Sequence, residues 1–306
     1  MDRGLARYET ALEERSVVLQ SPASVPERFV APGGNNGLVD VFRRRYLLSL
    51  IVKKEVGIRY RGSVLGWLWS YVKPLIQFVV FFFALGVFLR LNDSIEFYPI
   101  YLLSGITAVT FFNESFANGT RSLVDNAALI KKIYFPRQMF PVSSTFVAAI
   151  NTVPQIVVVI VIALFFGWSP SVLSIAALLL GLVIIALLAT GLGMLFGAIN
   201  VTFRDAQSFV EIIVMISVWA SPVMYQWQMV ASRVPDWLFQ LYSVNPITAA
   251  VELFHFGLWQ PLGPADAPPF PDLWTHAAIA TGIAVVMVML GELVFRNLEG
   301  RFAQDL

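Results

Sequence analysis

Six long apolar segments, separated by short polar connections, constrain this chain more than any other feature of its sequence. A helix needs about 20 mostly apolar residues to cross a bilayer, and segments of that length run over residues 71–89, 97–116, 140–166, 172–199, 208–226 and 274–295. Charged residues make up 13% of the 306 residues, against about 25% in an average soluble domain. The sequence therefore predicts an all-α integral membrane protein with six transmembrane helices over residues 70–296.

Lysine and arginine residues are distributed unevenly between the two sides that these spans define. Eleven of the 21 precede residue 70, four lie between the second and third spans, Arg204 follows the fourth span, and Arg296 and Arg301 follow the sixth. The other side carries Arg90 and Arg233. Because basic residues stay on the cytoplasmic side of a membrane, we expect a multi-pass protein of the inner (cytoplasmic) membrane with both termini in the cytoplasm.

The sequences before the first span and after the sixth span predict a polar arm and a polar tail. Residues 1–20 have no apolar core, so no cleavable signal peptide is expected. We interpret residues 1–40 as a flexible cytoplasmic arm, because the stretch 21–37 is rich in proline and glycine. Residues 297–306 are interpreted as a cytoplasmic tail. The net charge of +1 gives no indication of nucleic acid binding.

Residues 41–69 predict an amphipathic helix at the membrane surface. Wound at about 100° per residue, the segment gathers apolar side chains on one side (Leu47, Leu48, Ile51, Val52 and Ile58) and basic side chains on the other (Arg43, Lys53, Lys54 and Arg61). A basic helix of this kind lies in the headgroup plane, with its apolar side toward the acyl chains of the membrane lipids. The alternative is a solvated charge run before a signal anchor. The candidate residues of this interface helix are Lys54, Glu55, Arg59, Tyr60 and Arg61.

Three carboxylates interrupt the apolar spans, and each falls within about two turns of a cytoplasmic end: Glu114, Glu211 and Glu292. We interpret them as snorkelling, pairing with nearby arginines or capping helices, rather than as a proton relay. An ion-coupled transporter needs ionisable groups near the bilayer centre, and the sequence places none there. The energy for any transport is therefore expected to come from outside the spans.

Two patterns inside the spans indicate close contacts. In the third span the run Asn-Thr-Val-Pro-Gln at 151–155 breaks the apolar sequence and must face protein or a cavity. Helix packing and a polar wall of a translocation path both remain open for it. In the fourth span Gly193 and Gly197 form a GxxxG pattern, reinforced by Gly181 and Gly191, which lets another helix approach closely.

Composition also disfavours several kinds of chemistry. The chain has no cysteine, which excludes disulfides and thiolate catalysis, and no metal site is predicted. No stretch matches the phosphate loop GxxxxGK[ST], so the chain is expected to bind no nucleotide. Both histidines, His255 and His276, fall outside the membrane without a carboxylate arranged as an acid–base pair. We therefore expect a non-catalytic protein, with an integral-membrane glycolipid enzyme as the alternative.

Three stretches carry a family resemblance. They are RYRGSVLGWLWSYVKP at 59–74, NAALIKKIYFPRQMFPVSS at 126–144, and the pair ASPVMY at 220–225 and YSVNPITAAVELF at 242–254. In this order, and together with NVTFRDAQ at 200–207, they resemble the permease subunits of ABC transporters that export polysaccharides, teichoic acids or O-antigen-type glycans. The chain departs from the family pattern at Gln226, where proline is common, and at His255, where arginine is frequent.

The resemblance implies partners. Two permeases would form a homodimer and pair with two copies of a separate ABC ATPase subunit, which binds the cofactors ATP and Mg. A cytoplasmic coupling helix within 125–137 would dock in a groove of the ATPase and be braced by the interface helix. Its lysine and arginine residues would meet carboxylates there, and Ile130, Ile133 and Phe135 would supply apolar contact. The candidate coupling residues are Asp125, Ile130, Lys131, Lys132, Tyr134, Phe135 and Arg137.

The resemblance also implies a path and a gate. Most aromatic side chains of the first two spans are interpreted as facing lipid or the core. The candidates for a translocation path are Phe78, Phe82, Phe112, Asn151, Gln155, Trp219 and Tyr225. The proline-rich segment (residues 228–273) is expected to form re-entrant helices between spans five and six, and its alternative is an ordinary extracellular loop. Pro222, Asn245 and Pro246 are the candidates for an outer gate.

The cargo implied by the resemblance is a lipid-linked polysaccharide used in cell-wall biogenesis. The run NAALIKKIYFPR and the tail ending RFAQDL are most similar to exporters of cell-wall galactan in actinobacteria. O-antigen and teichoic acid are the alternatives among glycans, and a small lipid or drug is the alternative outside them.

Overall fold

The computed structural model describes residues 37–59, 62, 66–132, 135–263 and 268–305, and these ranges contain helices and no strand. The all-α fold predicted from the sequence is therefore found in the described part of the chain. Most of the arm expected over residues 1–40 lies outside the described residues.

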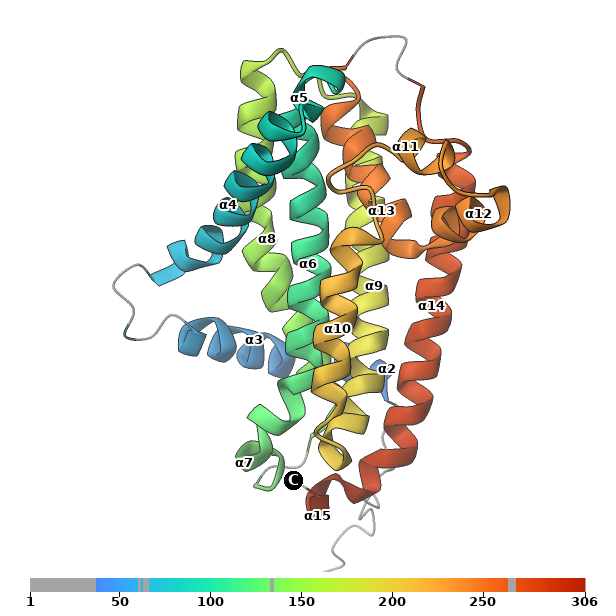
Figure 1. The fold of residues 1–306 in the computed structure, drawn as a ribbon. Helices are drawn as coiled ribbons and strands as arrows, with labels where there is room; N and C mark the ends of the chain where they lie inside the picture. The colour runs from blue at the N-terminus through green and yellow to red at the C-terminus, as the bar shows by residue number, and fades with distance from the viewer. Residues whose placement is uncertain (1–36, 60–61, 63–65, 133–134, 264–267, 306) are drawn as a thin grey trace, which may run out of the picture. The chain divides into compact units, whose positions relative to one another are not determined.

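The helices run in the following order (Figure 1). The first part comprises α2 (Leu38–Arg43), α3 (Arg45–Arg59), a short 3-10 turn at Gly66–Leu68, α4 (Trp69–Phe81), its continuation as the π-helix η2 (Phe82–Phe88), and α5 (Leu91–Ser94). The central part comprises α6 (Tyr98–Asp125), α7 (Ala127–Ile130), α8 (Met139–Phe165), α9 (Val172–Thr202) and α10 (Ala206–Trp219). The last part comprises α11 (Trp227–Ala231), α12 (Asp236–Val244), α13 (Pro246–Phe254), the π-helix η3 (His255–Trp259), α14 (Leu273–Leu298), the turn η4 (Glu299–Arg301) and α15 (Phe302–Asp305).

Four helices in the described ranges are long and apolar enough to cross a membrane. They cover Tyr71–Phe88, Met139–Phe165, Val172–Thr202 and Leu273–Arg301, which correspond to the predicted first, third, fourth and sixth spans. The second predicted span falls on α6, a helix of 28 residues that continues past residue 116 to Asp125 and is not one of these four helices. The six-span arrangement as a whole stays a prediction.

The fifth predicted span is shorter than expected. α10 has 14 residues and ends at Trp219, whereas the apolar segment runs to 226. Ser221 and Pro222 follow after one further residue, and a proline disfavours helical backbone in the residue before it. The apolar sequence therefore continues beyond α10 as a turn instead of a helix.

α9 is the central helix and lies between α6 and α14 (Figure 1). A Cβ atom added at Gly193 would lie 3.3 Å from the Cα of Gly119 on α6, and one added at Gly191 would lie 2.6 Å from the backbone of Met287 and Val288 on α14. The close helix approach predicted from the glycines of the fourth span is confirmed. Apolar helices in a membrane associate through this kind of backbone-to-backbone packing.

The segment expected as one interface helix over 41–69 is divided. α2 and α3 are separated at Arg44, whose backbone leaves the helical region (φ −97°, ψ 41°), and α3 ends at Arg59. Leu48 and Ile51 are buried in a cluster that includes Phe140, because α3 packs against α8. The apolar side of α3 thus contacts the protein instead of the acyl chains, although Ile58 is 56% exposed.

Adding one methyl group at Gly191 tests the central packing. Gly191→Ala should lower the free energy of unfolding by about 1–3 kcal/mol, the range for overpacking a tight interior, because the new Cβ meets backbone that cannot rotate away. Gly282→Ala on α14 is the matched control, since nothing lies within 4 Å of its added Cβ. Thermal unfolding in detergent compares the stability of each variant with that of the unchanged protein. Equal stability of the two variants would show that the packing of α9 does not depend on this contact.

Candidate functional site

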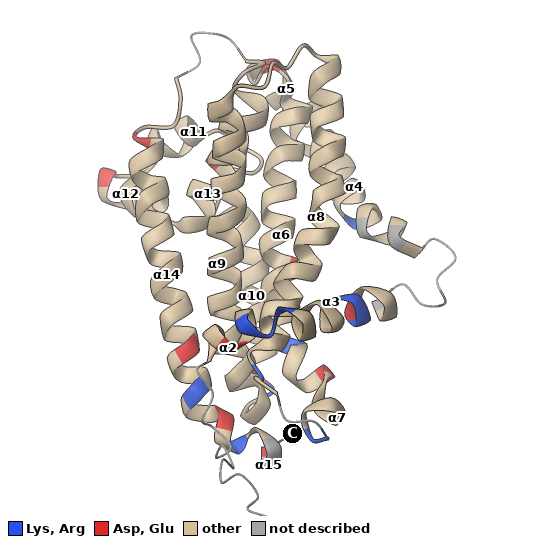
Figure 2. Cartoon of the chain, turned by 180° about the vertical axis from the view of Figure 1, so that it is seen from behind, with Lys and Arg blue, Asp and Glu red and all other residues tan. Residues whose placement is uncertain are grey.

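The described helices have two chemically different ends. Figure 2 shows that lysine and arginine residues gather near α3, α7, α15 and the last turns of α14, and we call this the basic end. α11, α12 and α5 lie at the other end (Figure 1). Because this end carries the proline-rich segment, we call it the proline-rich end.

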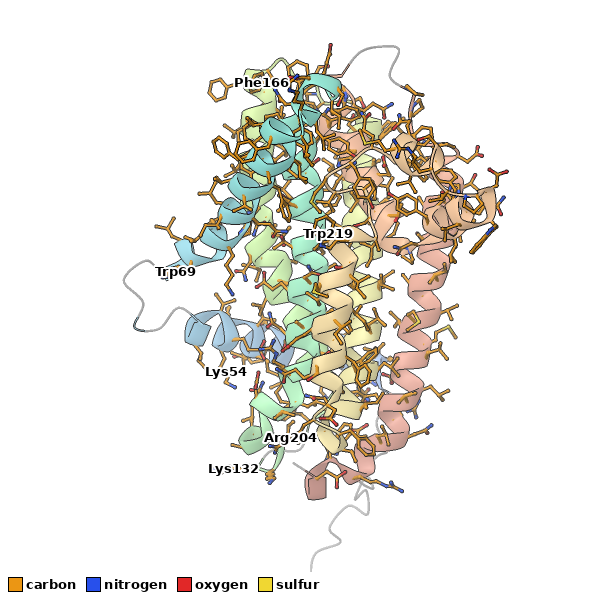
Figure 3. All side chains as sticks on the ribbon, in the orientation of Figure 1. Lys54, Trp69, Lys132, Phe166, Arg204 and Trp219 are labelled. Carbon is orange, nitrogen blue, oxygen red and sulfur yellow. The ribbon has the colours of Figure 1, made fainter. Side chains whose placement is uncertain are left out.

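A hydrogen bond joins α3 to the segment expected to couple to an ATPase. Lys54 Nζ donates to Asn126 Oδ1 at 2.7 Å, and Asn126 Nδ2 donates to the carbonyl of Ser122 at 2.9 Å. Asn126 is the residue between α6 and α7. The predicted bracing of the coupling segment by the interface helix therefore has a direct contact, and Lys54, Lys132 and Arg204 all lie at the basic end (Figure 3).

The candidate coupling residues divide into exposed and buried groups. Asp125, Lys131 and Lys132 are exposed. Ile130 and Phe135 are buried in this chain's own core at the basic end, where the Phe135 ring lies 5.4 Å from that of Phe140. The prediction that these two side chains offer apolar contact to a partner is therefore wrong, because the chain itself covers them.

Some predicted residues fall outside what the structure describes. Ile133 and Tyr134 of the coupling segment, and Tyr60 and Arg61 after the interface helix, lie outside the described residues. Of Arg59 the backbone alone is described.

The last turns of the chain pack onto the coupling segment. The Arg137 guanidinium donates to the carbonyl of Glu299 and lies 5.7 Å from the centre of the Phe302 ring, and Gln138 Nε2 donates to Glu299 Oε2 at 3.3 Å. Phe302 is fully buried. Arg137 was expected to meet a partner's carboxylate, but its guanidinium is held within the chain. Sequence reasoning missed this contact, and the signal was Phe302, the one aromatic residue of the tail sequence.

The three intramembrane carboxylates form different contacts. Glu211 pairs with Arg121 at 3.9 Å, and Glu292 Oε1 accepts a hydrogen bond from the backbone N–H of Leu38 at 3.3 Å. Pairing and capping, two of the predicted roles, are thus confirmed. Glu114 Oε1 accepts from Asn151 Nδ2 at 2.7 Å, and it lies in the body of α6 because this helix continues to Asp125.

The polar break of the third span takes part in packing between α8 and α6. Asn151 is fully buried and holds the contact with Glu114. Gln155 is also buried, and neither polar atom of its side chain has a hydrogen-bond partner among the described residues. Phe112 is fully buried against Phe116, so its predicted place along an open path is not found. Phe78 and Phe82 are half-buried and stack on each other with ring centres 5.7 Å apart.

At the proline-rich end, the two stretches that carry the Ser-Pro and Asn-Pro patterns are hydrogen-bonded to each other. Asn245 Oδ1 accepts from the backbone N–H of Ile247 at 3.1 Å and so caps α13, while its Nδ2 donates to the carbonyl of Ala220 at 3.3 Å. Thr248 Oγ1 donates to the same carbonyl at 3.3 Å. The Tyr101 hydroxyl lies 2.9 Å from the carbonyl of Pro222. The buried Pro222 turn is thereby held between α6 and α13.

Four of the predicted path and gate residues meet at one cavity beside this turn. The cavity has a volume of about 590 Å³, within the range of roughly 300–1,000 Å³ that is usual for ligand pockets. Its lining is mostly apolar and includes Trp219, Tyr225, Asn245, Pro246, Leu238, Leu241, Tyr242 and Ile283. Trp219 stands at the end of α10 (Figure 3) and is 58% exposed. The path candidates Phe78, Phe82, Phe112, Asn151 and Gln155 do not line it.

A buried polar group formed by residues of α6, α13 and η3 was missed from the sequence. The rings of His255 and Tyr101 stack 3.8 Å apart, and Glu252 Oε2 lies 3.8 Å from His255 Nδ1. Glu252 and His255 are buried. The departure from the family pattern at His255 thus falls inside the protein, next to the helix that carries the Asn-Pro cap.

This chain is similar to a family of transport proteins. A family model described as "ABC-2 type transporter" matches residues 46–259. A Klebsiella pneumoniae protein named O-antigen export system permease protein RfbA is 27% identical over 267 residues, which cover 85% of this chain and 95% of that protein. A Myxococcus xanthus protein of the same name is 26% identical over 269 residues, covering 87% of this chain and 98% of that protein.

Two substitutions of Asn245 distinguish the contributions of its two side-chain hydrogen bonds to stability. Asn245→Ala removes the cap of α13 and the bond to Ala220, and should destabilise the protein by about 0.5–2 kcal/mol, the usual cost of a lost N-cap. Asn245→Asp keeps the capping oxygen and loses the donor, so its unfolding temperature should lie between those of Asn245→Ala and the unchanged protein. If both variants unfold at the unchanged temperature, Asn245 does not hold this end together.

Proposed function

The chain belongs to the ABC-2 type transporter family, and from this membership we propose that it is the membrane-spanning subunit of an exporter of lipid-linked polysaccharide. In this proposal the cargo crosses the cytoplasmic membrane, and ATP is hydrolysed on a separate ATPase subunit that binds ATP and Mg. The relatives named as O-antigen export permeases support a glycan cargo.

The observation that carries the proposal is the convergence of Trp219, Tyr225, Asn245 and Pro246 on one cavity. Aromatic side chains combine a flat apolar face with a polar atom, so they can contact the CH-rich face of a sugar ring without holding it tightly. The cavity lies where the Asn-Pro cap meets the Ser-Pro turn. A gate at this position would open when α10 and α13 move apart and close when they approach each other, because both helices carry residues of the cavity wall.

The basic end is the proposed cytoplasmic side and the docking site of the ATPase. Positive residues are retained on the cytoplasmic side of membranes, and Lys131 and Lys132 are exposed beside α7. Interfaces combine charged rims with a buried anchor. Since Ile130 and Phe135 are covered by the chain itself, the proposed docking depends on the charged side chains and on backbone shape.

The proposed assembly has two copies of this chain and two ATPase subunits. α10 exposes a row of apolar side chains that ends at the cavity: Phe209, Ile212, Met215, Ile216 and Trp219. α10 by itself is too short to cross a bilayer core. Its 14 residues are about 21 Å long at 1.5 Å per residue, against roughly 30 Å for the core. A second copy placed against this row would enclose the open side of the cavity and form the path between two permeases.

Among glycans, we propose a cell-wall galactan or an O-antigen-like polymer as the cargo, with teichoic acid as the alternative. An apolar cavity selects its ligand by width and shape, so its residue types are compatible with each of these polymers. A small lipid or drug is the second candidate cargo, because the lining is mostly apolar.

Depletion of this protein in its native cell tests the proposal. One undecorated lipid-linked glycan should accumulate on the inner leaflet, because synthesis continues while export stops, and re-expression of the unchanged chain should clear it. Extraction and chromatography of the lipid-linked polymers measure the accumulation. An unchanged envelope with no accumulating glycan would contradict glycan export and favour the small-lipid or drug cargo.

A further inference from the structure

A second cavity lies at the basic end, between α3, α6 and α8. Its volume is about 340 Å³, at the lower end of the range for ligand pockets, which is roughly 300–1,000 Å³. Its lining residues come from all three helices and from the start of the coupling segment: Lys54, Glu55, Ile58, Asn118, Ser122, Asp125, Asn126, Ser144 and Val147. It is separate from the apolar cavity at the proline-rich end, with which it shares no residue.

The lining offers ammonium, carboxylate, amide and hydroxyl groups as hydrogen-bond donors and acceptors. Asn118 contributes a side-chain amide, which can both donate and accept. Ser122 and Ser144 donate to backbone carbonyls of their own helices, at 2.6 Å and 3.1 Å, so the lone pairs of their oxygens remain as acceptors. Ile58 and Val147 add apolar surface. A ligand that suits this wall has many hydroxyl groups and at least one apolar face.

The charges of the lining argue against an anionic ligand. Two carboxylates, Glu55 and Asp125, face one ammonium group, that of Lys54, and the Lys54 ammonium is already directed to Asn126. A phosphate or pyrophosphate would be repelled by the carboxylates more than it is attracted by the lysine. A neutral hydroxylated ring meets no such repulsion, and carboxylates and amides form good hydrogen bonds with its hydroxyls.

Glu55 adds a reason for a ligand at this position. One oxygen of its carboxyl is buried and has no hydrogen-bond partner among the described residues. Burial raises the pKa of Glu55 above its usual range, although hydrogen bonding with Ser143 opposes this shift. A carboxyl group that has lost water without gaining full hydrogen bonding is stabilised by a hydroxyl that enters beside it.

We infer that this cavity binds a sugar ring of the cargo at the basic end before transport. The inference rests on the proposed function, since it takes the cargo to be a glycan presented from the cytoplasmic side. A bound ring would contact α3 through Glu55 and Ile58, and α6 through Asn118. It would also lie next to Asn126, the residue that joins α6 to α7, so the site places the cargo beside the segment proposed to meet the ATPase.

Photo-crosslinking in the native cell tests the inference with the full chain. A photo-reactive amino acid replaces Ile58 in the cavity, Tyr46 on the same helix outside it, or Leu241 in the cavity at the proline-rich end. Tyr46 is the matched control because it is exposed on α3 and does not line the cavity. Carbohydrate captured on the purified protein is detected by periodate oxidation and hydrazide labelling, which do not respond to a captured acyl chain.

We expect carbohydrate on the protein with the probe at Ile58 and little with the probe at Tyr46. Adding Asn118→Ala to the Ile58 probe should lower the captured carbohydrate about fivefold, the loss expected for one hydrogen bond, while capture at Leu241 persists in the same background. Equal capture at Ile58 and Tyr46, or capture of lipid without carbohydrate at Ile58, would overturn the inference.

The outcomes also separate this inference from the proposed function. Carbohydrate at Leu241 with none at Ile58 would remove the site at the basic end and leave glycan export in place. Carbohydrate at neither position, together with no glycan accumulation on depletion, would contradict glycan export itself and with it the site.

Discussion

The fold depends on the contact of α9 with α6 and α14 through glycines. Gly191 lies against the backbone of Met287 and Val288, and Gly193 lies against Gly119, so the three helices meet backbone to backbone. In a bilayer, apolar side chains gain little by leaving lipid for protein, and helices associate through close packing. These three packed helices run between the basic end and the proline-rich end, and each end can be specialised for a different partner.

α10 is one of the helices that connect these ends, beside α6, α9 and α14. It begins beside Arg204 at the basic end, where Glu211 pairs with Arg121 of α6, and it ends at Trp219 in the wall of the apolar cavity. At the basic end, α3, the coupling segment and the tail are joined by the contacts of Lys54 and Arg137. A rigid displacement of this assembly would therefore reach the cavity through α10 and through α14, which carries Ile283 of the cavity wall, as is usual in transitions that shift packed elements.

The sequence was sufficient to predict features that follow from local composition. Long apolar runs, the small-residue face of the fourth span and the pairing of a carboxylate with a nearby arginine, as at Glu211, are found where the pattern placed them. The sequence assigned Ile130 and Phe135 to a partner contact and Phe112 to the path. An apolar residue in a sequence does not show whether lipid, a partner or the chain's own core covers its side chain. The contact of Arg137 with Glu299 joins residues far apart in sequence, so no local pattern reports it.

The most direct test of the account is to identify what binds the basic end. A photo-reactive amino acid at Lys132, in the full chain and the native cell, is compared with one at Arg233; both positions are exposed, at opposite ends of the described helices. The account predicts that an ABC-type ATPase is captured at Lys132 and not at Arg233. Capture of the ATPase at Arg233, or at neither position, would contradict the proposal that the ATPase docks at the basic end and supplies the energy for transport there.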